Sequence, residues 1–202
     1  MPHTNVSLAT LLGSRMCHDL ISPIGAIQNG LELLEMAGSG GDISAEMSLI
    51  KDSCASAAAR IKFFRVAFGG SSEGQNVGTR EILQTLDGIC QGTRLEANWT
   101  STEDAPRSDV QLAYLGFQCC EAALPVGGSI QIDAVGSGWS LTATGRKYKV
   151  DEPLWAHLRG ENDGEDIPAS RIQFLMLPIL AEARGRKITA TANDDGIRID
   201  IV

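Results

Sequence analysis

The sequence lacks the features of a membrane or secreted protein. Its longest apolar run, Phe174 to Ala181, is far shorter than the roughly 20 residues that a membrane-spanning helix needs. Residues 1–8 also lack the basic segment and apolar run of a signal peptide. We therefore expect a cytoplasmic protein that has no association with a membrane.

Clustered basic residues are absent as well. Lysine and arginine number 17 against 25 aspartates and glutamates, which gives a formal net charge of −8. Nucleic-acid binding depends on grouped cations that neutralise phosphates, so this composition argues against a nucleic-acid partner. Acidic proteins of this kind usually bind other proteins or small molecules.

Cysteine is scarce and unpaired. The five cysteines include no C-x-x-C pair, and an odd number fits reduced thiols better than disulfides or a zinc site. We expect them to be small packing residues. They are Cys17, Cys54, Cys90, Cys119 and Cys120.

Two segments with helical periodicity open the chain. They run from Asn5 to Met36 and from Ile43 to Phe68, and the short breaker run Gly38 to Asp42 between them predicts an antiparallel hairpin. Apolar residues in the second segment alternate in spacings of four and three, which is a heptad seam. The seam comprises Ile43, Met47, Ile50, Cys54, Ala57, Ile61, Phe64 and Phe68. Because two helices cannot enclose a core, we expect residues 1–70 to form a homodimeric four-helix bundle.

A Gly- and Ser-rich stretch from Gly69 to Gln75 predicts a linker to a second domain at 76–202. There the periodicity alternates between 3.6 and 2, which favours the α+β class with a two-layer α/β sandwich. We expect helices at 79–90, at 108–124 with Ser108 as its cap, and after Pro168, and strands at 94–99, 129–134, 139–144, 187–192 and 197–202. The last two strands form a hairpin through the Asp-Gly turn at 193–196.

His18 lies on the exposed side of the first predicted helix. On a helical wheel, a group of apolar residues falls on the opposite side and predicts the bundle core. That group is Leu12, Met16, Leu20, Pro23, Ile24, Ile27, Leu31 and Leu34. The face around His18 is expected to dock a partner protein. Its small or polar residues are Ser14, Ser22, Gly25 and Asn29, with Arg15 nearby, and Leu11 and Ile21 flank it as apolar residues without an evident place in the core.

Asp19 follows His18 directly, and the two side chains together suggest a nucleophilic site. A neutral imidazole nitrogen is a nucleophile near pH 7, and a carboxylate beside it can accept the proton of the other ring nitrogen. Pro23 removes a backbone donor about one turn later and should bend the helix there. The apolar stripe continues through Leu34, so we expect the helix to continue beyond the proline. His-Asp as a dipeptide is also common on ordinary protein surfaces.

The run HDLISPIGAIQNGLELLE, from His18 to Glu35, resembles the phosphoacceptor helix of the ChpT family of bacterial histidine phosphotransferases. The segment Glu121 to Gly128 is similar to the degenerate kinase-type domain of that family. The resemblance implies that His18 is phosphorylated and that the hairpins dimerise. It further implies that phosphate arrives from the receiver domain of a hybrid histidine kinase and leaves to response regulator receiver domains.

An ATP-dependent sensor histidine kinase is the nearest alternative. In such kinases a metal-binding Asn stands eight residues before a Gly-Gly, and here that position is Cys119, whose thiol is a poor ligand for magnesium. No Asp-x-Gly-x-Gly motif occurs between Trp139 and Ser170. We therefore expect that the chain binds neither ATP nor another cofactor, with magnesium on the partner receiver domain. A non-catalytic dimeric scaffold that binds receiver domains is the second alternative.

Overall fold

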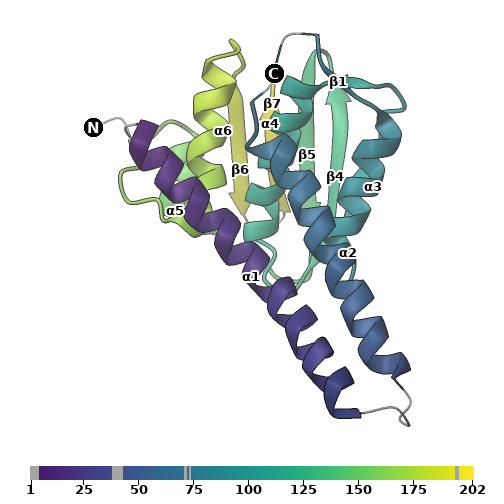
Figure 1. Cartoon of the computed structure of the whole chain (residues 1–202). Helices are drawn as coiled ribbons and strands as arrows, with labels where there is room; N and C mark the ends of the chain where they lie inside the picture. The colour runs from purple at the N-terminus through teal and green to yellow at the C-terminus, as the bar shows by residue number, and fades with distance from the viewer. Residues whose placement is uncertain (1–4, 38–42, 71, 73, 194–195) are drawn as a thin grey trace.

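The computed structural model describes residues 5–37, 43–70, 72, 74–193 and 196–202 of the chain. Two long helices form a hairpin whose far ends project beyond a sheet covered by shorter helices (Figure 1). Within the described residues, no helix is both long and apolar enough to cross a bilayer. The α+β class expected from the sequence is confirmed.

The hairpin consists of α1 (Asn5–Ala37) and α2 (Ser44–Ala67), which lie side by side (Figure 1). Both predicted helices are confirmed, whereas the predicted connection at 38–42 lies outside the described residues. A Cβ on Gly30 would meet Cγ1 of Ile50 at 2.6 Å. The glycine thus allows the two helices to approach closely in their outer halves.

The main sheet has five strands in the order β2-β4-β5-β7-β6. These are β2 (Leu95–Trp99), β4 (Gly128–Val135), β5 (Gly138–Thr144), β6 (Ile188–Asn193) and β7 (Gly196–Ile201). The predicted strands are confirmed, and β2 and β4 pair in parallel, whereas the other neighbours in the sheet pair antiparallel. A helix between them, α4, provides the crossover that parallel pairing requires. Part of the predicted turn, residues 194–195, lies outside the described residues.

Helices cover one face of the sheet (Figure 1). They are α3 (Thr79–Cys90), α4 (Arg107–Ala122) and α6 (Ile172–Glu182), joined by the shorter α5 (Glu152–Leu158). The prediction that Ser108 caps α4 is wrong, because the helix begins at Arg107 and Pro106 occupies the cap position. The helix after Pro168 opens with a 3-10 turn at Ala169–Arg171. Neither α5 nor the short pair β1 (Asn76–Val77) and β3 (Ala105–Pro106) was predicted.

One hydrophobic core extends from the sheet to the end of α2. Phe63 of α2 is 2% exposed and stacks on Tyr114 of α4 with ring centroids 4.5 Å apart. Gln111 donates from Nε2 to the carbonyls of Ala67 and Gly69, at 3.1 and 2.9 Å. The division into domains at 1–70 and 76–202 stays a prediction, and the core runs across that boundary.

Candidate functional site

His18 stands in the middle of α1 with its side chain 81% exposed, as predicted. Its Nδ1 lies 3.1 Å from Oδ1 of Asp19, whose own side chain is only 11% exposed. When Nδ1 carries the proton, it donates to Asp19, and Nε2 keeps its lone pair for attack. The pair thus offers an exposed nucleophile that is oriented by a largely covered carboxylate.

Most of the predicted docking face is open. Ser14, Ile21, Ser22 and Asn29 are exposed and Gly25 is half-buried, and Ile21 reaches 69% exposure. A Cβ on Gly25 would meet nothing within 4 Å, so the space beside it is free. A partner backbone can therefore approach α1 on the turns that follow His18.

Leu11 and Arg15 are placed differently from the expectation. Leu11 is half-buried and packs against the core, which corrects the prediction that it has no place there. Arg15, 15% exposed at its side chain, forms an ion pair with Asp19 at 2.7 Å and donates to the backbone carbonyl of Ser170. Both side chains turn toward the α/β part because α1 lies against it, a contact that a wheel of one helix does not contain.

Two residues predicted for the bundle core are exposed in the single chain. Ile24 and Leu31 are each 49% exposed, although the neighbouring Pro23 is buried. Pro23 lies inside α1, so the helix continues through it as expected. Within the hairpin, α2 does not bury Ile24 and Leu31 as it buries their neighbours on α1.

A surface hollow of about 450 Å³ begins one turn after His18. Ser22 and Pro23 of α1 form one wall, and Asp52 and Arg60 of α2 form the opposite one. Gln91 and Gly92, which follow α3, close the far end. The α/β part therefore contributes surface next to the histidine face.

A smaller cavity of about 70 Å³ lies between the hairpin and the α/β part. Arg15, Asp19 and Arg60 line it from the hairpin, and Gln118 and Glu121 of α4 line it from the other side. Burial raises the pKa of Glu121, while the positive charges of Arg15 and Arg60 oppose the rise. Apart from Arg15 and Asp19, none of these side chains was predicted for the site. The four-residue spacing of Arg15 and Asp19 was a usable signal, but nothing local pointed to Glu121 or Arg60.

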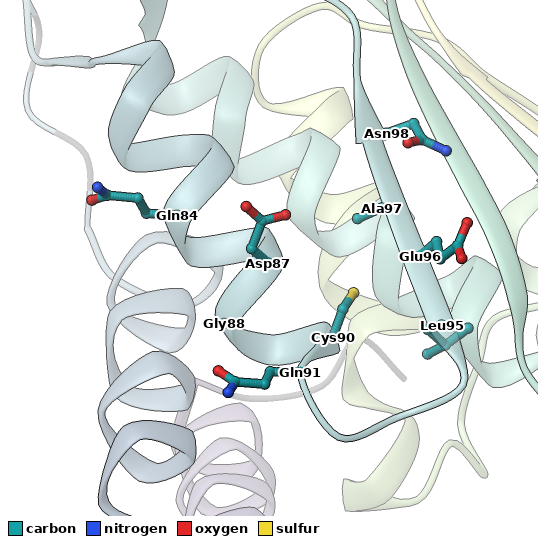
Figure 2. A pocket seen from close by; sticks show the side chains of 9 residues that line it. All are labelled: Gln84, Asp87, Gly88, Cys90, Gln91, Leu95, Glu96, Ala97 and Asn98. Carbon is teal, nitrogen blue, oxygen red and sulfur yellow. The ribbon is translucent and has the colours of Figure 1, made fainter. Parts of the chain in front are cut away.

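An open groove of about 670 Å³ lies between α3 and β2 (Figure 2). Asp87 of α3 and Glu96 of β2 make it acidic. Its lining contains no residue of α1. It shares Gln91 with the hollow that begins at Ser22, so the two adjoin where α3 ends.

The cysteines divide into exposed and buried thiols. Cys17 and Cys54 are exposed, Cys90 is half-buried, and Cys119 and Cys120 are fully buried in α4. Burial raises the pKa of Cys90 to about 11 and that of Cys120 to about 12, and it also raises the pKa of Cys119. Cys119, at the position where a kinase would carry its metal-binding Asn, is thus a packing residue.

We predict that only exposed thiols react with a disulfide reagent at pH 8. In a Cys54→Ser variant, Cys17 should react at once, whereas the three remaining thiols should react only after denaturant is added. A rise of two pKa units leaves roughly 100-fold less reactive thiolate. Absorbance of the released reagent, with and without denaturant, counts the two classes. Fast reaction of a second thiol per folded chain would contradict the protection expected for Cys90 in α3, and fast reaction of a third would contradict the burial in α4.

Comparison with known proteins agrees with this arrangement. Residues 79–196 match the family model for the histidine phosphotransferase C-terminal domain. Protein phosphotransferase ChpT of Brucella abortus (strain 2308) is 36% identical over 197 residues, covering 94% of this chain and 93% of the relative. A solved structure described as a bacterial phosphotransferase superposes with a TM-score of 0.81 at 31% identity, covering 100% of this chain and 98% of the other. The chain therefore belongs to the ChpT family of histidine phosphotransferases.

Proposed function

We propose that the chain carries phosphoryl groups between receiver-domain aspartates of a bacterial phosphorelay through His18, without using ATP. The observation that carries this proposal is the exposed imidazole with Nδ1 3.1 Å from Asp19, on a helix face with open space at Gly25. Membership of a phosphotransferase family supports it. The donor is the receiver domain of a hybrid histidine kinase, the acceptors are response regulators, and the compartment is the cytoplasm.

The chemistry needs one bond to break and one to form. The lone pair of His18 Nε2 attacks phosphorus as the bond from phosphorus to the receiver aspartate breaks, and the aspartate leaves as a carboxylate. Positive charge that develops on the ring is shared with Asp19 through Nδ1–H. The resulting phosphohistidine then gives its phosphoryl group to a second aspartate by the reverse step.

This protein contributes position and a nucleophile. The expected magnesium site belongs to the receiver domain, where the ion would neutralise charge on the moving phosphoryl group. Ser14, Ser22 and Gly25 would let the receiver backbone approach, while Ile21 supplies an apolar contact. Asn29 lies further along the same exposed face.

Radiolabel transfer tests the proposal. The protein is incubated with labelled ATP alone and, in parallel, with a purified receiver domain that carries labelled phosphoaspartate. We expect acid-labile label on this chain only from the phosphorylated receiver. Label from ATP alone would make it a sensor kinase, and binding without label from cognate receivers would favour the scaffold.

We further propose that two hairpins pair as a homodimer. Ile24 and Leu31 of α1 are exposed. Ile43 at the N-cap of α2, and Met47 and Ile61 within it, are 42%, 36% and 53% exposed. Large apolar residues grouped on one element favour burial against another protein. A second hairpin would supply the two further helices that a four-helix core needs.

A charge placed in that seam should dissociate the dimer. We predict that the double variant Leu31→Glu, Ile61→Glu weakens association by about 3 kcal/mol or more, roughly 100-fold in Kd, because unpaired carboxylates would be buried. Light scattering of wild type and variant measures the mass. Val126→Glu, at a position 41% exposed in the α/β part, is the matched control and should leave the mass unchanged. A variant that keeps the wild-type mass would refute the seam.

A further inference from the structure

We propose that Arg15 is a positioning residue through which the α/β part orients the His18–Asp19 pair, with Glu121 as its anchor on α4. The inference rests on the proposed phosphotransfer and deepens it. It assigns a role at the histidine to a part of the chain that does not itself touch the imidazole.

A chain of contacts starts at the histidine and leads through Asp19 to Arg15. His18 Nδ1 faces one oxygen of Asp19, Oδ1, at 3.1 Å. Arg15, four residues earlier on the same helix, forms an ion pair with the other oxygen, Oδ2, which lies 2.7 Å from its Nε. The carboxylate is therefore held from both sides, and it cannot rotate away from His18 without leaving Arg15.

Arg15 also contacts the α/β part. Its guanidinium donates to the carbonyl of Ser170, in the 3-10 turn that precedes α6. Arg15 also lines the cavity between the two parts, together with Glu121 of α4. Glu121 is half-buried there and interacts electrostatically with Arg15, Arg60 and Asp19.

Glu121 occupies an unfavourable place for a carboxylate. Burial outweighs the favourable arginines, so the pKa of Glu121 is raised and its ionised form is less favourable than in water. Gln118, 5% exposed, lines the same cavity with an Oε1 that has no hydrogen-bond partner among the described residues. Charged and polar side chains thus share this cavity with apolar walls, which include Phe63 and Phe117. Ionisable groups placed in such surroundings beside a reactive pair favour a functional role over a packing role.

Arg60 extends the arrangement to the surface. It lines both this cavity and the hollow that begins at Ser22. The two arginines of the hairpin therefore line the same cavity as Glu121, and Arg60 also reaches the surface beside the histidine face. A change at Glu121 is expected to reach His18 through Arg15 and Asp19.

The experiment compares Arg15→Gln and Glu121→Gln with matched controls. Arg65→Gln and Glu81→Gln remove a different ion pair between hairpin and α/β part, 3.4 Å long and outside the cavity. Long-range proton–nitrogen spectra of histidine-labelled protein report the imidazole tautomer, and a His18→Gln spectrum identifies the signals. Transfer rate and receiver affinity are measured on the same samples.

In wild type we expect the Nδ1–H tautomer of His18 to dominate. In Arg15→Gln and Glu121→Gln its share should fall clearly, and the transfer rate should drop about tenfold because the imidazole is less well oriented. Receiver affinity should change by less than about twofold, since neither side chain is on the exposed face. Both controls should behave as wild type.

Two results would overturn the proposal. An unchanged tautomer with a slower transfer rate would mean that Arg15 acts on the receiver instead. A tautomer change in Arg15→Gln but not in Glu121→Gln would remove the α/β part from the arrangement. If the wild-type protein accepts no phosphate, the proposed function fails, while the tautomer comparison still decides this inference.

Discussion

Replacing His18 by alanine should reduce phosphoryl acceptance from a phosphorylated receiver by at least about a thousandfold, because the substitution removes the nucleophile itself. Stability should hardly change. The side chain is 81% exposed and its polar contact is to the neighbouring Asp19. Exposed substitutions of this kind usually alter the free energy of unfolding by less than about 0.5 kcal/mol. A gel assay of transferred label and a thermal melt measure the two quantities.

The control is Val6→Ala, on the same helix three turns earlier and 76% exposed, which should transfer label as wild type does. Peptide mapping adds a second check, because His157 in α5 lies far along the sequence and is separable by proteolysis. Full labelling of His18→Ala, or label mapped to His157, would reject His18 as the acceptor.

Phe63→Ala should destabilise the protein by about 3–5 kcal/mol, the usual cost of emptying a buried aromatic site. Phe63 is 2% exposed, stacks on Tyr114 and lies 6.2 Å from the ring of Phe117. For a chain of this size we expect the melting temperature to fall by roughly 10 °C. Helical circular dichroism and tryptophan fluorescence follow the unfolding.

The circular dichroism signal reports on all helices, whereas the tryptophan fluorescence reports on the α/β part alone. All three tryptophans, Trp99, Trp139 and Trp155, belong to the α/β part, whereas Phe63 belongs to the hairpin. Because the core is continuous, both signals should shift together. Lys62→Ala, at the exposed neighbouring position, controls for the change in helix sequence. A tryptophan transition that stays at its wild-type temperature would show that the two parts unfold independently.

Local sequence patterns were sufficient to predict most helices and strands and the exposure of His18. The heptad spacing of α2 and the alternation in β4 and β5 are properties of short windows, so the predicted helices and strands agree with the structure to within a few residues. The helix α5 is only seven residues long, which is too short for its period to stand out. The exposure of His18 followed from the wheel because the opposite face is strongly apolar.

Contacts between segments that are distant in the sequence could not be predicted from local patterns. The parallel pairing of β2 with β4 depends on where α4 returns the chain, and the burial of Leu11 depends on the face against which α1 rests. Glu121 meets the hairpin only after α4 has packed on α2. No local spacing in the sequence predicts these contacts, because they join residues from 33 to about a hundred positions apart or form on a surface made by several elements.

The stretch after α2 resembles a flexible joint in its glycine content, yet α4 holds it in place. Gln111 donates to the carbonyls of Ala67 and Gly69, and Arg107 donates to those of Arg65 and Gly70. An enzyme that carries ATP on one domain to a histidine on another must swing the two together once in every cycle. We expect a chain clamped at this joint to work in the opposite way, with its histidine fixed relative to the α/β part while receiver domains bind and leave. Its turnover would then be governed by their encounter and departure.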